Sequence, residues 1–154
     1  ALIGMVYGRT HTRMIPEMGG LGKVMPWLAT CFYVGGLASL GLPGLSGFVA
    51  ETHVFLGGFF GNEWHSRPAT LTLTVLATLS IVVTAVYVLR GLAKVFQGPI
   101  ENHHFEELTD ATLPERISTG TLVGVLFLVG VAPWPLINLI ERAVIPILNR
   151  LHGN

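Results

Sequence analysis

Residues 40–51 read Leu40-Gly41-Leu42-Pro43-Gly44-Leu45-Ser46-Gly47-Phe48-Val49-Ala50-Glu51, and this stretch decides the fold. No charged side chain occurs between Val24 and Ala50, so Glu51 is an isolated carboxylate in an apolar run. Pro43 lacks a backbone donor, and Gly44 and Gly47 loosen the backbone, so these three residues predict a break in a helix. A carboxylate at mid-bilayer costs roughly 2.5–3.5 kcal/mol on insertion scales and usually lines an ion or proton path.

Composition predicts an all-α integral membrane protein built as a transmembrane helix bundle. The 154 residues are 51% hydrophobic and 12% charged, with a mean hydropathy of +0.61; average soluble domains carry about 25% charged residues. The formal net charge is zero, which gives no electrostatic reason to expect nucleic acid as a partner. The single Cys31 excludes a disulfide framework and is expected to be a buried, inert thiol.

We expect residues 1–154 to form part of a single membrane domain, and five segments follow from the apolar pattern. They are residues 1–7 as the end of a helix, 26–60 as the broken helix, 69–96 and 115–132 as spanning helices, and 135–151 as a C-terminal amphipathic tail. The sequence lacks an initiator Met and a signal peptide, and its first residues resemble the end of a longer helix, so we expect a fragment.

The broken segment allows two interpretations. As one straight helix its 35 residues would reach about 52 Å at ~1.5 Å each, too long for a bilayer core of about 30 Å. It is either one discontinuous, tilted span or two short spans joined at residues 42–45, and both place Glu51 within the membrane. Residues three, four or seven positions away share the helix face of Glu51, whereas His53 points elsewhere. Those residues are Gly47, Phe48, Val54, Phe55 and Gly58.

Other candidate features have ordinary explanations beside functional ones. Thr70, Thr74 and Thr78 form an i, i+4 row, which packs and bonds to its own helix or else lines a wet path. His103 and His104 lie beside carboxylates, but their spacing fixes no metal-ligand set, so a solvated loop is expected. No nucleotide-binding or zinc-protease motif occurs, and one Cys cannot hold an iron–sulfur cluster. The sequence therefore predicts no cofactor and no metal in this chain.

Several motifs resemble the antiporter-like subunits of respiratory complex I, the proton-pumping NADH-quinone oxidoreductase, and among them subunit M, also called chain 4. They are Arg9-Thr10-His11-Thr12-Arg13, Gly19-Gly20-Leu21, Leu37 to Gly44, Gly47 to Glu51, and Gly130 to Leu136. Sister subunits L and N and the sodium/proton antiporters usually carry a lysine where this sequence has Glu51, whereas subunit M carries a glutamate. Thr52 and His53 depart from the apolar residues expected there, so His53 either packs or joins the proton path.

The resemblance implies fourteen transmembrane helices in the complete protein, of which this chain would hold the last part. It favours one discontinuous span for residues 26–60 and implies that Glu51 is a proton-loading carboxylate in a translocation channel. It also implies that subunits L and N are neighbours, that lipid and protons are the other partners, and that the complex is a translocase. The expected location is the inner (plasma) membrane of a cell, multi-pass, with a mitochondrial or plastid membrane as the alternative.

Three rival interpretations stay open. Glu51 is a structural carboxylate paired with a basic residue of other helices. Alternatively, the chain belongs to a membrane-bound hydrogenase or to a cation/proton antiporter. The glutamate at position 51 disfavours the antiporter but not the hydrogenase. Lastly, the chain is a stand-alone four-helix scaffold without transport.

Overall fold

The computed structural model describes residues 1–61, 67–100 and 103–151, and over these residues the chain is helical with no β-strand. The prediction of an all-α fold is confirmed. The elements are α1 (Leu2–Thr10), η1 (Ile15–Glu17), α2 (Leu21–Val24), α3 (Pro26–Ser39), α4 (Ser46–Phe60), α5 (Arg67–Phe96), η2 (His103–Glu107), α6 (Leu113–Val131) and α7 (Trp134–Leu151).

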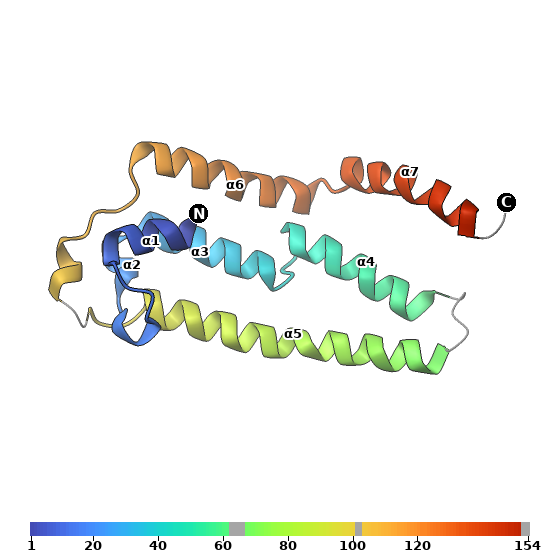
Figure 1. Cartoon of the computed structure of the whole chain (residues 1–154), viewed down its shortest axis with the longest axis horizontal. Helices are drawn as coiled ribbons and strands as arrows, with labels where there is room; N and C mark the ends of the chain where they lie inside the picture. The colour runs from blue at the N-terminus through green and yellow to red at the C-terminus, as the bar shows by residue number, and fades with distance from the viewer. Residues whose placement is uncertain (62–66, 101–102, 152–154) are drawn as a thin grey trace.

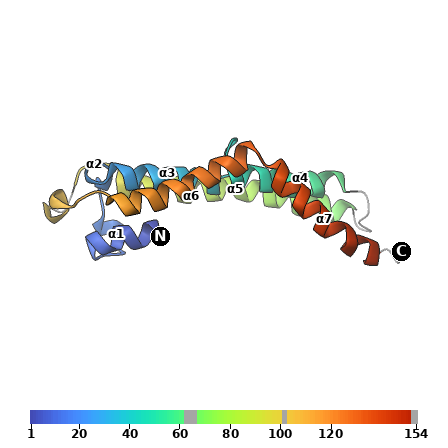
Figure 2. The same ribbon diagram turned by 90° about the horizontal axis from the view of Figure 1, so that it is seen from above.

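The helices lie nearly parallel or antiparallel in an elongated bundle. Figure 1 shows α3 and α4 following one another along the long axis, with α5 running back beside both of them. With 30 residues, α5 is about 45 Å long at ~1.5 Å per residue. Helix α6 lies on the opposite side of α3 from α5, and α7 continues beyond its end (Figure 1). Seen from above, α1 lies to one side of the layer formed by the long helices (Figure 2).

The turn between α3 and α4 is built by two glycines with left-handed backbone. Helix α3 ends in a Schellman motif: the Leu42 N–H donates to the Leu37 carbonyl, and the Gly41 N–H donates to the Ala38 carbonyl, both at 3.3 Å. Gly41 has a φ of 63° and Gly44 a φ of 90°, values that side-chain-bearing residues rarely adopt. Pro43 follows two residues after the capping glycine, where it prevents the helix from resuming at once.

Close backbone approaches hold the turn in place. A Cβ atom at Gly47 would collide with the Ala38 carbonyl oxygen, so the first turn of α4 lies directly on the last turn of α3. A Cβ atom at Gly130 of α6 would likewise collide with the backbone of Gly44 and Leu45. The turn is therefore packed against its own two helices and α6, while Leu42 and Pro43 stay exposed.

The tightest packing lies at the end of the bundle where α2, α3, α5 and η2 meet. Leu21, Met25 and Leu28 are fully buried there, with Phe96 and Phe105 beside them. The segment expected as a solvated loop thus contributes Phe105 and Ala111 to the core. His104 and Glu107 are exposed in the same segment, so the expectation holds for these polar side chains and fails only for the two apolar ones.

The opposite pattern holds along α5 and α6, whose apolar side chains are mostly exposed. Val83 is 67% exposed, as is Val131, and Leu128 is 64% exposed. Within the described residues, two helices are long and apolar enough to cross a membrane, at Pro68–Phe96 and Leu113–Val131. Apolar surfaces of this extent are typical of contact with lipid or with other helices.

Candidate functional site

Glu51 lies in the second turn of α4, and its carboxylate rests against the turn between α3 and α4. A Cβ atom built on Gly41 would lie 2.7 Å from the Glu51 Cδ and 3.2 Å from its Oε1. The carboxylate therefore occupies space that any other residue at position 41 would fill. Gly41 thus has two roles: it adopts the positive φ that ends α3, and its lack of a side chain leaves space for the Glu51 carboxylate.

The Glu51 side chain is partly exposed and faces α5 across a cavity of about 320 Å³. The cavity is lined by Ser39, Glu51, Phe55, Ala77, Ser80, Ile81 and Thr84. Three hydroxyl groups thus share this space with one carboxylate, and none of these seven lining residues is basic. A hydroxyl-lined cavity can hold water and exchange hydrogen bonds with a carboxylate in either protonation state.

The hydroxyl groups on α5 are engaged with their own helix. Ser80 Oγ donates to the Ala77 carbonyl at 2.6 Å, and Thr84 Oγ1 donates to the Ser80 carbonyl at 3.2 Å. Their oxygen atoms can still accept hydrogen bonds. Ser39, the last residue of α3, donates no hydrogen bond to any described residue.

His53 lies apart from Glu51. Its Nδ1 is 2.6 Å from the Val49 carbonyl oxygen, and a carbonyl only accepts, so Nδ1 carries the proton. His53 lines a different cavity of about 270 Å³, together with Pro133, Ile140 and Glu141 near the start of α7. The two residues singled out from the sequence are thus on one helix but in separate cavities.

Thr74, the middle residue of the threonine row, packs against α4, whereas Thr78 is exposed. Thr74 is 8% exposed and touches Gly58, where a Cβ atom would clash with its side chain. Thr74 and Thr78 donate to the carbonyls of Thr70 and Thr74 at 2.8 and 2.9 Å. The hydroxyl protons of Thr74 and Thr78 are therefore bound to the preceding turn, which favours packing over a wet path.

His104 is exposed on η2, and the side chain of His103 lies outside the described residues.

A polar cluster far from Glu51 ties α1, α3 and α6 together. Arg9 Nη2 lies 2.6 Å from Glu115 Oε2, and the same guanidinium donates to the carbonyls of Met5, Thr109 and Asp110. Asp110 accepts from the Trp27 N–H at 2.9 Å and the Leu28 N–H at 3.4 Å, so it caps the start of α3. Sequence reasoning missed this cluster, although Thr112 and Glu115 form a readable capping-box pattern, in which the Thr112 N–H donates to Glu115.

Comparison with known proteins gives consistent results. Residues 1–78 match the family described as NADH:quinone oxidoreductase/Mrp antiporter, TM. A NAD(P)H-quinone oxidoreductase chain 4 of a Synechococcus strain is 40% identical over 135 residues, which is 86% of this chain and 25% of the relative. The chain 4 of Trichormus variabilis is 35% identical over 99% of this chain and 29% of the relative, and that of a Synechocystis strain 42% identical over 78% and 22%.

These relatives are NAD(P)H-quinone oxidoreductase subunits by name, and the chain spans about a quarter of their length. The sequence resemblance to complex I subunits is thereby confirmed. The chain belongs to the NADH:quinone oxidoreductase/Mrp antiporter transmembrane family, among the antiporter-like membrane subunits of complex I.

Proposed function

We propose that this chain is part of a proton-translocating membrane subunit of a quinone-reducing complex, with Glu51 as a proton-loading carboxylate. One observation carries the proposal: a lone carboxylate, in a sequence stretch free of other charges, faces a cavity lined by hydroxyl groups beside a helix turn. Carboxylates kept in such surroundings are typical of proton paths. The driving force would come from electron transfer elsewhere in the complex, and the chain itself would move only protons.

The proposal includes a discontinuous membrane helix formed by α3, the turn and α4. Helix α3 has 14 residues and α4 has 15, so each is about 21–23 Å long and too short to cross ~30 Å of hydrocarbon alone. Helix α4 begins without a side-chain cap; the Phe48 N–H donates to the Leu45 carbonyl at 3.2 Å, which leaves the N–H groups of Ser46 and Gly47 to bond water. Broken helices are tolerated within a membrane only where protein or water satisfies such groups.

The test is substitution of Glu51 in the intact complex. Glu51→Gln keeps the shape but cannot release a proton, so we expect proton pumping and coupled quinone reduction to fall strongly. Glu51→Asp keeps the carboxylate and should do less harm. The measurements are protons moved per electron pair in sealed vesicles and the rate of quinone reduction. Near-normal pumping by the Gln variant would remove the proposal.

The same variants separate a structural role. If Glu51 were only a partner for a basic residue in another helix, Glu51→Gln would lower the thermal stability of the complex while the surviving complexes pumped normally. We expect the reverse: an assembled, stable complex with impaired pumping.

His53 serves as a second comparison. Because its cavity is separate from that of Glu51, we propose a packing role and expect His53→Gln to pump nearly as the parent does. A loss matching that of Glu51→Gln would instead place His53 on the proton path.

Cation/proton exchange is a second candidate because the family description includes the Mrp antiporters. Glu51 in place of a lysine disfavours it. Vesicles with and without sodium separate the two functions: the proposed pump acidifies at the same rate in both, and an antiporter requires sodium.

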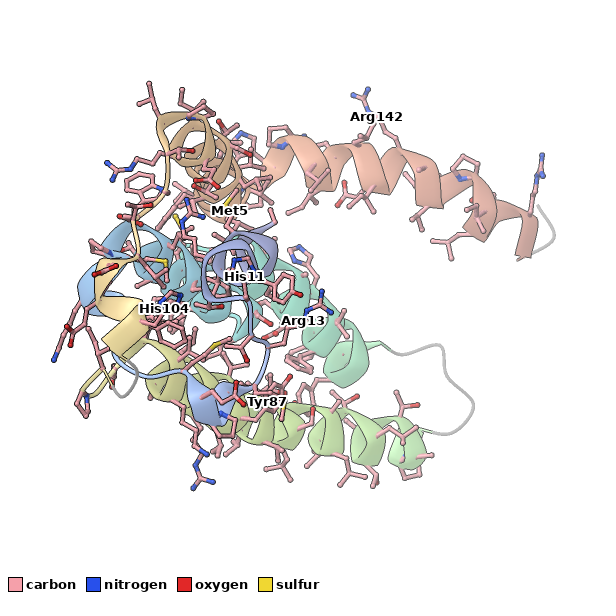
Figure 3. The ribbon with its side chains drawn as sticks, turned by 60° about the vertical axis from the view of Figure 1, so that its left-hand side comes forward. Met5, His11, Arg13, Tyr87, His104 and Arg142 are labelled. Carbon is pink, nitrogen blue, oxygen red and sulfur yellow. The ribbon has the colours of Figure 1, made fainter. Side chains whose placement is uncertain are left out.

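The proposed setting is the inner membrane of a cell, with neighbouring antiporter-like subunits such as L and N as partners. The exposed apolar sides of α5 and α6 would face lipid or those subunits. Helix α7 runs on from α6 along the long axis of the bundle and shares a cavity with α4, and Arg142 points away from the other helices (Figures 1 and 3).

A further inference from the structure

Ser39 is shared by two cavities. It lines the cavity of Glu51, and it also lines a larger one of about 560 Å³ between α1, α3 and α5. Of the residues that line these two spaces, Ser39 alone belongs to both. It is also the last residue of α3, directly before the turn on which the Glu51 carboxylate rests.

The two cavities follow one another along a single face of α5. Ala77, Ser80 and Thr84 line the first, whereas Tyr87, Gly91 and Val95 line the second. Spacings of three and four residues place all of them on one side of the helix. The two spaces are therefore consecutive along the interface of α3 with α5, and Ser39 lies where they meet.

The larger cavity is mostly apolar but carries polar groups at one side. Arg13 and Tyr87, both labelled in Figure 3, line it. The Arg13 guanidinium lies 4.4 Å from the centre of the Tyr7 ring. Thr12 lines it as well. Water entering beside these groups would reach Ser39 through apolar surroundings, which wet only intermittently and so limit proton leakage.

Ser39 differs from the other two hydroxyl groups around Glu51. Ser80 and Thr84 donate their protons to carbonyls of α5, whereas Ser39 donates to no described residue. A hydroxyl that relays a proton must accept a hydrogen bond on one side and donate one on the other. Of the three, Ser39 has its proton available for this.

We propose that Ser39 relays protons between Glu51 and the larger cavity, an inference that rests on the proposed role of Glu51. In the loading step, a hydronium in the larger cavity gives a proton to Ser39 Oγ, and the original Ser39 proton moves to a Glu51 carboxylate oxygen. One O–H bond forms on Glu51 and one breaks on the hydronium, which becomes water. Rotation of the neutral Ser39 hydroxyl then resets the relay.

The experiment compares Ser39→Ala and Ser39→Thr in the intact complex, beside Glu51→Gln and the control Ser118→Ala. Ser118 is an exposed serine of α6 that lines neither cavity. The readouts are protons pumped per electron pair and the slowing of pumping in D₂O. We expect Ser39→Ala to pump about fivefold more slowly, the factor given by losing one hydrogen bond, with a changed D₂O effect. Ser39→Thr should restore both, and Ser118→Ala should match the parent.

The outcomes separate the relay from the proposed function. If Glu51→Gln is defective while Ser39→Ala pumps normally, the relay is wrong and the role of Glu51 stands. If Ser39→Ala and Ser39→Thr are equally impaired, Ser39 is a packing residue and the relay is wrong. Ser80→Ala provides the last comparison: a loss as large as that of Ser39→Ala would show that Ser39 does not differ from the other hydroxyl groups of the cavity, which overturns the assignment to Ser39. Normal pumping by Glu51→Gln would overturn the proposed function itself.

Discussion

The Glu51 carboxylate occupies the space that a side chain at position 41 would need, and this contact could be predicted from the sequence only in part. The sequence identifies Pro43 and the glycines as a helix break and Glu51 as an isolated charge, because both conclusions need only local chemistry. It does not show that the carboxylate folds back onto Gly41, because that contact depends on the angle at which α4 leaves the turn. The partners on α5, Ser80 and Thr84, were missed for the same reason.

Replacing Gly41 by alanine tests this contact. We expect Gly41→Ala to displace the Glu51 carboxylate, since the new Cβ would lie 2.7 Å from its Cδ, and to lower proton pumping to at most the level of Glu51→Asp. Gly44→Ala is the matched control: it also forces alanine into a positive φ, but nothing lies within 4 Å of its Cβ. Both variants should lose roughly 1 kcal/mol of stability or more, measured by thermal unfolding, and Gly44→Ala should retain more of its pumping. Equal pumping in the two variants would contradict the contact.

The residues at which α3 begins and ends follow local sequence rules, but the side chain that caps the start of α3 does not. Pro26 suits the first turn of α3, and Gly41 followed by Pro43 suits its end. The side chain that caps α3, however, is Asp110, which lies 83 positions later than Trp27. No sequence pattern near α3 indicates this cap. The sequence predicts a solvated loop for the segment that holds Asp110, whereas the structure shows that Phe105 of this segment is buried.

Asp110→Ala should therefore weaken the start of α3. The variant loses both acceptors for the N–H groups of Trp27 and Leu28, at a cost of about 1 kcal/mol. The thermal unfolding temperature of the intact complex, or the rate of limited proteolysis near α3, measures the loss. Asp110→Asn keeps one acceptor oxygen and should lose less. If alanine and asparagine gave the same stability as the parent, the cap would contribute nothing.

Over the whole molecule, composition predicts the class of protein, while the arrangement depends on contacts between distant residues. Low charge and long apolar runs are properties of the composition, and they can be read without any knowledge of packing. The prediction of an all-helical fold followed from them. The pairing of Arg9 with Glu115 joins residues 106 positions apart. The placement of Glu51 and His53 in separate cavities likewise depends on where α5 and α7 lie. These relations arise from three-dimensional packing that a pattern of residues along one chain does not encode directly.

A charge placed at mid-length on α5 tests the membrane setting of the molecule. Val83 is 67% exposed near the middle of the span Pro68–Phe96, so Val83→Arg would put a cation in hydrocarbon at a cost of roughly 2.5–3.5 kcal/mol. We expect the inserted fraction of the chain in microsomes to fall sharply. Leu89→Arg is the control: Leu89 is 45% exposed but lies beside Arg90, near the polar end of α5, where a long cationic side chain can reach water. It should insert nearly as the parent does. If Val83→Arg inserted equally well, the exposed side of α5 would face water, and a membrane-spanning bundle would be ruled out.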